Sequence, residues 1–149
     1  MKRIILTIIV VLLVTVTSAQ TFTVGDLQYA INEDNFSVTV TGHVEEYQHG
    51  ALDIPETVSY GGTDYAVTAI GDNAFNGSVY YTSLSLPNTI TAIGENAFNF
   101  CYGFTGSLTI PNSIVSIGIC AFYDCDGFND TLTIGSSVSH IGDGAFISC

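Results

Sequence analysis

Ile117-Gly118-Ile119-Cys120-Ala121-Phe122 is one of four copies of the frame Ile-Gly-x-x-Ala-Phe in this 149-residue chain. The other copies begin at Ile70, Ile93 and Ile141, so successive copies start 23, 24 and 24 residues apart. A fixed period of this length is typical of a solenoid, in which each unit buries its apolar face only by stacking on its neighbours. We therefore expect one continuous array of about four coils.

Each later copy of the frame follows a short alternating segment. The segments are Leu84-Ser85-Leu86-Pro87, Leu108-Thr109-Ile110-Pro111 and Leu132-Thr133-Ile134-Gly135, each starting nine residues before the next Ile-Gly. Alternation of apolar and polar residues predicts a strand, and the proline or glycine ends it. Asp72, Glu95 and Asp143 follow Ile-Gly, where an acidic residue suits the start of a short helical turn. The pattern thus predicts a β-rich solenoid of short strands and short helical turns.

The complete unit, read from Leu108 to Cys125, has the pattern Leu-x-Ile-Pro-x-x-Ile-x-x-Ile-Gly-x-x-Ala-Phe-x-x-Cys. It resembles the BspA-type leucine-rich repeat of bacterial surface proteins over about residues 52–149, and the preceding region is similar to the N-terminal caps of such proteins. The chain departs from the pattern at Gly135, in the proline position, and at Ser78, in the cysteine position. The resemblance implies a leucine-rich-repeat solenoid that serves in adhesion to host matrix proteins or neighbouring cells.

Residues 1–19 have the features of a cleavable signal peptide. Met1-Lys2-Arg3 precedes an apolar run from Ile4 to Val16, and the small residues Thr17-Ser18-Ala19 follow. The apolar run is too short for a membrane span. We expect cleavage after Ala19 and a mature chain that is secreted or held at the cell surface without membrane insertion.

The charge argues against one class of partner. Lys2 and Arg3 are the only basic residues besides three histidines, so removal of the signal peptide changes the formal net charge from −12 to −14. A chain without Lys or Arg cannot neutralise phosphates, which argues against nucleic acid and anionic membrane surfaces as partners. The 14 acidic side chains either keep the exterior solvated or attract basic partners or calcium.

Residues 20–50 are expected to form an N-terminal β-hairpin cap, and residues 51–149 the repeat array. Leu27–Ile31 and Phe36–Val40 alternate apolar and polar residues, and the turn-forming cluster Asn32–Asn35 separates them. Such a hairpin would cover the open end of the first coil. No linker composition divides the two parts, so one domain is predicted.

The first coil of the array is longer than the others. Leu52 precedes Ile70 by 18 residues, whereas the corresponding interval is nine in the later coils. The additional residues contain Gly61-Gly62 between Val58 and Val67. A glycine pair between two strand-forming segments predicts a projecting two-stranded ribbon.

Three of the four cysteines follow the repeat. Cys101, Cys125 and Cys149 are spaced by 24 residues and occupy one position of successive coils, whereas Cys120 falls at another. Four cysteines in an exported chain often form disulfides. Their place in the core position instead predicts buried thiols, because free cysteine packs as a small apolar side chain.

The histidines do not form a pattern typical of catalysis. His43 and His49 are six residues apart, whereas zinc-protease chemistry needs two histidines four apart on a helix. We therefore interpret residues 43–49 as a solvated loop. His140 occupies a repeat position held elsewhere by small residues and is expected at the surface. The sequence predicts a non-enzymatic protein without a cofactor.

Asp124, Asp126 and Asp130 form a weak candidate calcium site. Alternating oxygen donors before a glycine suit a hard cation. Their spacing does not complete an EF-hand, because Asn129 and Gly135 stand where glycine and glutamate are needed. The corresponding stretch of the previous coil contains no carboxylate.

Hydroxyl side chains that recur on successive strands form the first candidate binding surface. They are Ser83, Ser85, Ser107, Thr109, Thr131 and Thr133. Alternation places them opposite the inward leucines, on the exposed face. Such a strip suits contact with a protein, a glycan or ice. Small polar residues also suit any solvated strand, so a purely structural stalk or a fragment of a larger surface protein stays open as a third class.

Aromatic residues near the coil corners form the second candidate binding surface. They are Tyr80, Tyr81, Phe100, Tyr102 and Tyr123. Aromatic rings supply large contact areas to protein or glycan partners. Phe104 and Phe128 recur in phase with the repeat and are expected to pack inside.

The frame residues are expected to form the core, namely Ile93, Phe98, Ile117, Phe122, Ile141 and Phe146. The last unit reaches Cys149 without the strand that follows the same position in earlier coils. Its apolar end therefore lacks a polar cap. We expect either a truncated piece of a longer array or a second chain over this end. Both alternatives predict self-association through the C-terminal coil.

Overall fold

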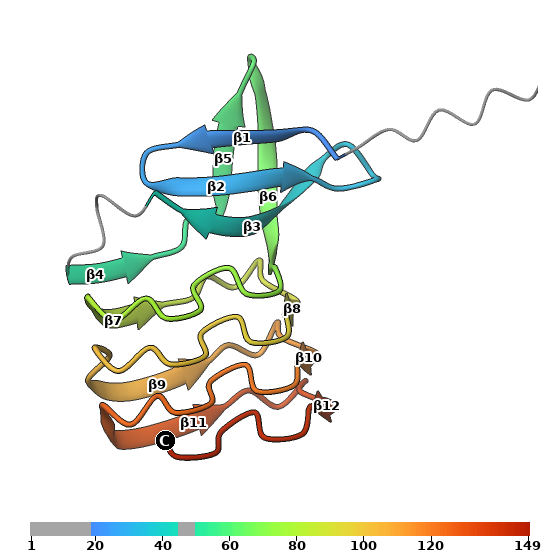
Figure 1. The fold of residues 1–149 in the computed structure, drawn as a ribbon. Coiled ribbons are helices and arrows are strands. Elements are labelled where there is room, and N and C mark those ends of the chain that lie inside the picture. Colours follow the sequence, from blue (N-terminus) through green and yellow to red (C-terminus); the bar gives the residue numbers. More distant parts are fainter. Residues whose placement is uncertain (1–18, 45–49) are drawn as a thin grey trace, which may run out of the picture.

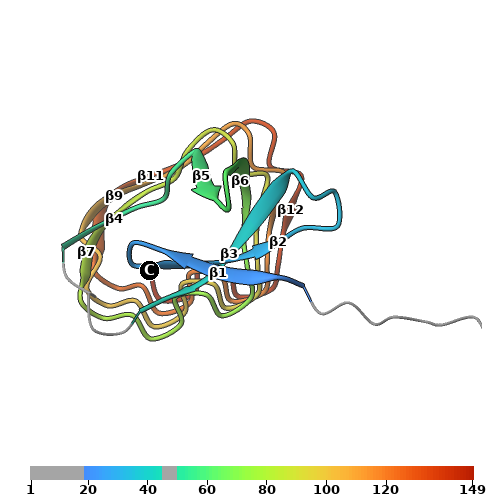
Figure 2. The same cartoon turned by 90° about the horizontal axis from the view of Figure 1, so that it is seen from above.

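A computed structural model describes residues 19–44 and 50–149. Figure 1 shows a stack of β-coils with a small antiparallel sheet over one end, and Figure 2 shows that the coils superimpose when they are viewed along the stack. The described residues form twelve strands and no helix. This architecture is the β-rich leucine-rich-repeat solenoid behind an N-terminal hairpin cap that the repeat predicts.

The cap is a sheet of three antiparallel strands. They are β1 (Thr21–Val24), β2 (Leu27–Ile31) and β3 (Ser37–His43). The predicted hairpin corresponds to β2 and β3, and β1 is a strand that the sequence pattern did not indicate. On its other edge β3 pairs in parallel with β6 (Thr63–Ile70), with Val40 opposite Ile70. The cap is therefore hydrogen-bonded to the first coil.

A two-stranded ribbon interrupts the first coil, as predicted. β5 (Thr57–Tyr60) and β6 pair antiparallel around Gly61-Gly62. The two glycines have φ angles of 60° and 82°, a backbone conformation that side chains rarely adopt. The ribbon rises past the cap in Figure 1. The Tyr60 ring stacks on Phe22 of β1 with 4.2 Å between ring centroids, which holds the ribbon against the cap.

Two stacks of parallel strands run down the solenoid. In the first stack, β6 is followed by β8 (Ala92–Ile93), β10 (Ser116–Ile117) and β12 (His140–Ile141). In the second stack, β4 (Gly50–Asp53) pairs with β7 (Tyr81–Ser85), and β9 (Gly106–Ile110) pairs with β11 (Phe128–Ile134). Equivalent residues of successive coils lie side by side, so Ile117 pairs with both Ile93 and Ile141.

The segment after each Ile-Gly is a series of turns, so the predicted short helical turn is wrong. The fourth residue of every frame has a positive φ: Asn73 58°, Asn96 53°, Cys120 53° and Gly144 70°. A residue in the left-handed region interrupts the right-handed α conformation. Backbone amides in these turns bond to the next coil instead, as when Phe98 N donates to Ala121 O at 2.7 Å.

The glycine of the frame is required by contact between coils. A Cβ added at Gly118 would lie 2.5 Å from the carbonyl carbon of Gly94, and one added at Gly142 would lie 2.4 Å from Ile119 N. At the same place Gly118 N donates to Ile93 O at 2.8 Å. The backbones of successive coils therefore meet at a separation that excludes any side chain.

A ladder of stacked phenylalanine rings fills the interior of the solenoid. Phe75, Phe98, Phe122 and Phe146 stack with centroid separations of 5.3, 5.1 and 5.4 Å and interplanar angles of 1°, 14° and 4°. The first three rings are fully buried. The frame isoleucines Ile93 and Ile117 are buried beside them, so these four predicted core residues, Ile93, Phe98, Ile117 and Phe122, lie as expected.

The last coil departs from the predicted core. Ile141 is 50% exposed, and Phe146 is only partly buried. The core prediction is therefore wrong for Ile141 and only partly right for Phe146. In the middle of the stack, each inward side chain is covered on both sides by equivalent residues of neighbouring coils, whereas no described coil follows this one. Ile134 and Ile147 are exposed at the same end.

Thiols of successive coils bond to the backbone of the preceding coil. Cys101 and Cys125 are buried, as predicted, and their thiols donate to Phe75 O at 3.1 Å and to Phe98 O at 3.0 Å. The Cys149 thiol makes the equivalent bond to Phe122 O at 2.9 Å but is exposed. A hydrogen bond with the Cys101 thiol, together with burial, raises the pKa of Cys125.

Phe122→Ala tests the phenylalanine ladder. Because Phe122 stacks on a ring on each side, we expect its truncation to lower the free energy of unfolding by about 3–5 kcal/mol, which would largely unfold so short an array. Phe36→Ala, in the exposed turn of the cap, is the control. Thermal melts should separate the two variants clearly, and a Phe122→Ala melt within a degree or two of wild type would contradict the stacking.

The thiols should differ in their reactivity. Burial and a raised pKa keep the thiolate form of Cys125 scarce, so a thiol reagent should label Cys125 and Cys101 slowly in the folded protein. Cys149 is exposed and should react faster than these two, although partial burial also raises its pKa, and all four cysteines should react completely in denaturant. Mass spectrometry would follow each site, and a bridge between Cys101 and Cys125 would contradict this prediction.

The exposed apolar end predicts self-association of residues 20–149. Light scattering should detect species larger than a monomer, because Ile134 and Ile147 can bury against a second copy. Ile134→Asn combined with Ile147→Asn should shrink these species. Val115→Asn should not, since Val115 is exposed on the third coil rather than at the end of the stack. A monomer at high concentration would show that the end does not associate.

Candidate binding surface

The six predicted hydroxyl residues lie on one exposed face, which we call the hydroxyl strip. It consists of Ser83 and Ser85 on β7, Ser107 and Thr109 on β9, and Thr131 and Thr133 on β11, and all six residues are exposed. Strand alternation turns the intervening Leu108 inward, where it is buried. Thr109 lies directly beside Thr133 in the parallel pair.

The hydroxyls of the strip differ in their partners. Ser107 Oγ donates to Asp130 Oδ2 at 3.0 Å, and Thr131 Oγ1 donates to Asp130 Oδ1 at 3.3 Å. The other four hydroxyls, those of Ser83, Ser85, Thr109 and Thr133, make no side-chain hydrogen bond to another residue in the described ranges. These four groups are therefore available to a ligand without first breaking an internal bond.

Exposed aromatic rings gather beside the strip at the corner of two coils. Phe100 lies 5.9 Å from Tyr102 and 5.7 Å from Tyr123 between ring centroids, and we call these three residues the aromatic corner. Phe100 and Tyr102 are exposed, and Tyr123 is partly buried. Tyr80, in the preceding coil, is also exposed. The corner is thus a contact surface that brings Tyr123 of one coil to Phe100 and Tyr102 of the coil before it.

Tyr81 does not belong to this surface, and the prediction that it is a contact residue is wrong. It is only 4% exposed, because it takes an inward position of β7. Its ring packs edge-on against Phe75 at 6.1 Å and against His43 at 5.7 Å. Phe104 is buried as predicted and stacks on the partly buried Phe128 at 5.2 Å.

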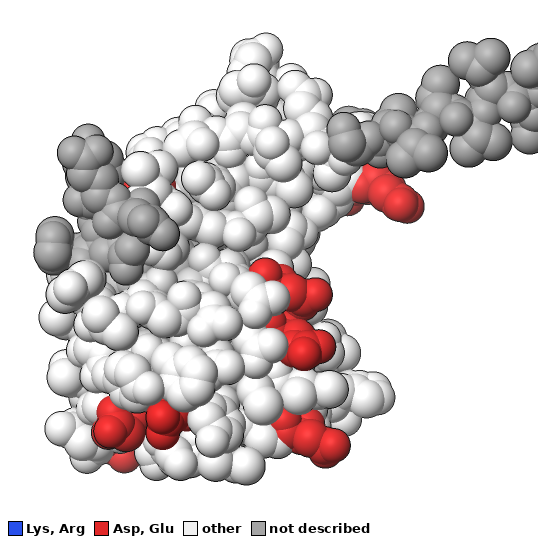
Figure 3. All heavy atoms as spheres, viewed as in Figure 1, with Lys and Arg blue, Asp and Glu red and all other residues white. Residues whose placement is uncertain are grey.

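The candidate calcium ligands do not converge. Asp130 accepts hydrogen bonds from the hydroxyl strip, and Asp124 accepts one from Tyr102 Oη at 3.4 Å. Within residues 19–44 and 50–149, no group of three or more His, Cys, Asp or Glu side chains could hold a metal ion. The calcium site is therefore not supported. Figure 3 shows the acidic side chains in separate groups on the face it displays.

The interpretation of residues 43–49 as a solvated loop is wrong for His43. His43 ends β3, and its Nε2 lies 2.8 Å from Oγ of the buried Ser78. Its ring stacks on Phe75 at 5.5 Å, so His43 joins the cap to the first coil and is not part of a solvated loop. Residues 45–49 of the predicted loop lie outside the described residues. His140 is exposed as predicted.

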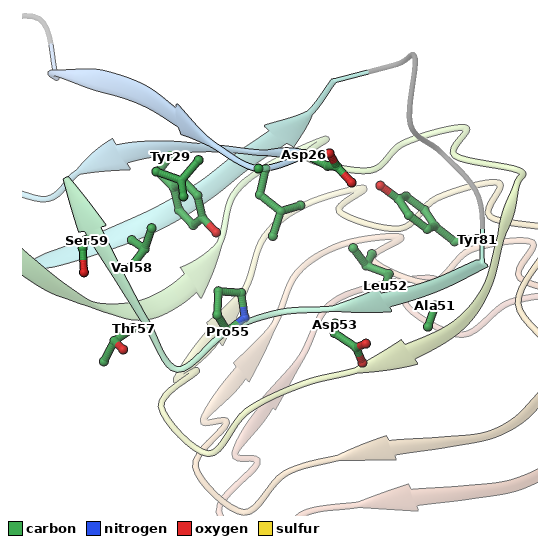
Figure 4. A pocket seen from close by; sticks show the side chains of 13 residues that line it. Asp26, Tyr29, Ala51, Leu52, Asp53, Pro55, Thr57, Val58, Ser59 and Tyr81 are labelled. Carbon is green, nitrogen blue, oxygen red and sulfur yellow. The ribbon is translucent and has the colours of Figure 1, made fainter.

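A pocket of about 520 Å³ lies between the cap and the first coil, and the sequence did not indicate it. Figure 4 shows Tyr29 and Asp26 from the cap, Leu52 and Val58 from the first coil, and Tyr81 from the second. Burial raises the pKa of Tyr29 to about 12. Burial and then the charge of Asp26 raise the pKa of Tyr81. Both phenols therefore stay protonated at neutral pH.

The part of the chain that the structure describes contains no helix long and apolar enough to cross a membrane. The hydroxyl strip, the aromatic corner and the pocket under the cap are the candidate contact surfaces described so far.

Comparison with known proteins places this fold in a family. Residues 66–149 match the family described as BspA type leucine rich repeat region (6 copies). A leucine-rich repeat protein of known structure from Bacteroides capillosus is similar over 81% of this chain and 86% of its own, with 30% identity and a TM-score of 0.72. None of the curated protein sequences matches the chain.

Two further structures share the fold at lower identity. A leucine-rich repeat protein of T. pallidum is 22% identical, with a TM-score of 0.63 over 87% of this chain and 68% of its own. The pneumococcal vaccine antigen PcpA is 18% identical, with a TM-score of 0.57 over 87% of this chain and 42% of its own. The family match covers more than half of the residues, and the repeat frame, the strand stacks and the phenylalanine ladder agree with it. This chain belongs to the BspA-type leucine-rich repeat family.

Proposed function

We propose that this chain is an exported, non-catalytic binding protein whose hydroxyl strip and aromatic corner attach to a protein partner in adhesion. The observation that carries the proposal is the set of four exposed hydroxyls without internal partners in the described ranges, on strands of which β9 and β11 begin a few residues after the aromatic corner. The leader-like residues 1–19 support export. A host matrix protein is the class of partner that the family resemblance suggests.

The physical character of the face fits a protein partner. Tyr and Phe side chains are enriched in the cores of protein interfaces, and hydroxyls provide hydrogen bonds around them. Neighbouring coils repeat their side chains at the spacing of adjacent strands, about 4.8 Å. A partner with an extended segment can therefore meet several coils at once.

Charge favours a basic partner. The mature chain would carry 14 acidic side chains and no Lys or Arg, so its field attracts positively charged surfaces and repels acidic ones. This attraction acts mainly on the rate of association and weakens with salt. Specificity would come from the strip and the corner, which are bordered by the carboxylates of Asp53, Asp124, Asp126 and Asp130.

A glycan is the second candidate ligand. The aromatic corner favours it, because the exposed faces of Phe100 and Tyr102 offer apolar surface to sugar rings beside the hydroxyl donors of the strip. Variants can distinguish the two candidate ligands, because glycan binding should depend on the residues of the aromatic corner far more than on those of the hydroxyl strip.

Binding arrays of host matrix proteins and of glycans, probed with residues 20–149, test the proposal. Ser83→Gln combined with Thr109→Gln adds bulk to the strip and should weaken protein binding about tenfold, or about 1.4 kcal/mol. Thr91→Gln combined with Ser139→Gln is the matched control, since both are exposed near β8 and β12 in the other strand stack. The control should change binding less than twofold.

The remaining outcomes separate the alternatives. Loss of binding on Phe100→Ala with Tyr102→Ala, without an effect of the strip variant, would support the glycan reading and overturn the protein one. Binding on neither array would favour a structural stalk. Thermal melts of all variants should match that of wild type, so that a change in binding reflects the surface and not the fold.

A further inference from the structure

The pocket under the cap is built by residues that the repeat does not specify. Asp26 sits in the two-residue loop between β1 and β2, where Gly25 has a φ of 59°. Tyr29 comes from β2, Leu52 from β4 and Tyr81 from β7. The pocket therefore exists only where the cap meets the first coil, and its volume of about 520 Å³ lies in the range of small-ligand sites.

Two buried phenols line this pocket without a hydrogen-bond partner among the described residues. Tyr29 is only 1% exposed and Tyr81 only 4%, and neither hydroxyl bonds to another side chain or to the described backbone. In Figure 4 the Tyr29 hydroxyl points toward the space beside Pro55, and the Tyr81 hydroxyl points toward Asp26. The rings are buried but the two hydroxyls open onto the pocket, so they can donate hydrogen bonds to a polar ligand there without breaking an internal bond.

The pocket has a single charged side chain directed to the tyrosines. Asp26 lies close enough to Tyr81 for its charge to raise the pKa of that phenol. Asp53 also borders the pocket, but Figure 4 shows its side chain on the other face of β4 from Leu52. No Lys or Arg occurs after Arg3, so within residues 19–44 and 50–149 no lysine or arginine pairs with Asp26. Of the two carboxylates among the described lining residues, Asp26 is therefore the one that makes the Tyr81 side of the pocket anionic.

Apolar side chains form the rest of the wall. Leu27, Leu52, Pro55 and Val58 lie between the carboxylate and the ribbon, and the three of them that strand alternation turns inward are buried. A ligand that fills this space needs an apolar stem as well as a polar head. We propose that the pocket binds an aliphatic ammonium group, with its nitrogen at Asp26 and the Tyr81 phenol and its methylenes along Leu52 and Val58.

Other ligand classes fit less well. An anion would be repelled by Asp26, and an uncharged apolar ligand would leave the carboxylate and both phenols desolvated and unpaired. A metal ion would find only one carboxylate, whereas calcium takes six to eight oxygen ligands. The ammonium can come from a lysine side chain of a partner or from a free amine. The inference goes beyond the proposed function and does not depend on it.

Titration of residues 20–149 with Nα-acetyl-lysine methylamide, followed by amide NMR shifts, tests the inference. Shifts of Gly25 and Leu52 should saturate at millimolar concentrations and weaken with salt, because the contact is a charge pair in a shallow pocket. The Nε-acetylated form of the same probe removes the charge and keeps the stem, so it should bind at least fivefold more weakly. Equal binding of the two probes would overturn the inference.

Variants assign the contact to this pocket. Asp26→Asn should weaken the lysine probe about fivefold or more, and Tyr81→Phe, which keeps the ring, about twofold to threefold. Asp143→Asn removes the same charge in the last coil and should leave binding unchanged. If Asp26→Asn and Asp143→Asn weakened binding of the lysine probe equally, the loss would be due to net charge alone, and a specific site in this pocket would be contradicted. Absence of saturable shifts would contradict it as well.

A second probe identifies the source of the ammonium. Butylamine has the stem and the charge of a lysine side chain without the peptide groups. Tighter binding of the lysine probe than of butylamine would assign the pocket to a side chain of a partner. Equal affinity would assign it to free amines. Binding of either probe that depends on Asp26 supports the inference.

Discussion

The close approach of successive backbones at the Ile-Gly step fixes the geometry of this molecule. Gly118 N donates to Ile93 O, and Gly94, Gly118 and Gly142 each face the backbone of the coil before them with no space for a Cβ. This contact sets the separation of the coils. The phenylalanine rings can then stack at 5.1 to 5.4 Å, and the hydroxyls of neighbouring strands fall into register.

The same constraint explains why the first coil needs a different neighbour. A coil exposes backbone groups and apolar side chains on both of its open sides, and β3 satisfies one side by pairing in parallel with β6. His43 extends the aromatic ladder by one ring, since it stacks on Phe75 in the way that Phe98 does on the other side. The cap therefore continues both the hydrogen bonding and the stacking of the repeat with residues of unrelated sequence.

The period of the sequence predicted the features that recur in every coil. It could not predict features that occur once, where the cap meets the first coil or where the last coil is left uncovered. The strands, the buried Phe98 and Phe122, and the exposed hydroxyls follow from their phase. The helical turn was wrong because left-handed backbone at Asn96 and Cys120 is not visible in an apolar pattern. Ile141 has the right phase but is 50% exposed, because no described coil covers it. The pocket was not predicted because Asp26, Tyr29 and Leu52 are not related by the repeat. In the sequence, Tyr29 and Leu52 also look like ordinary inward residues of alternating strands.

Parallel stacking in exact phase gives the hydroxyl strip a translational symmetry along the solenoid axis. A partner that reads only hydroxyls would meet nearly the same surface after sliding by one coil, losing only the contacts at one end of the strip. Bound states offset by one coil would then coexist, and the complex would tolerate movement along the axis. The aromatic corner and the cap interrupt this symmetry, because each occurs at one place. A partner that also contacts the aromatic corner or the cap would therefore bind at one fixed position along the strip.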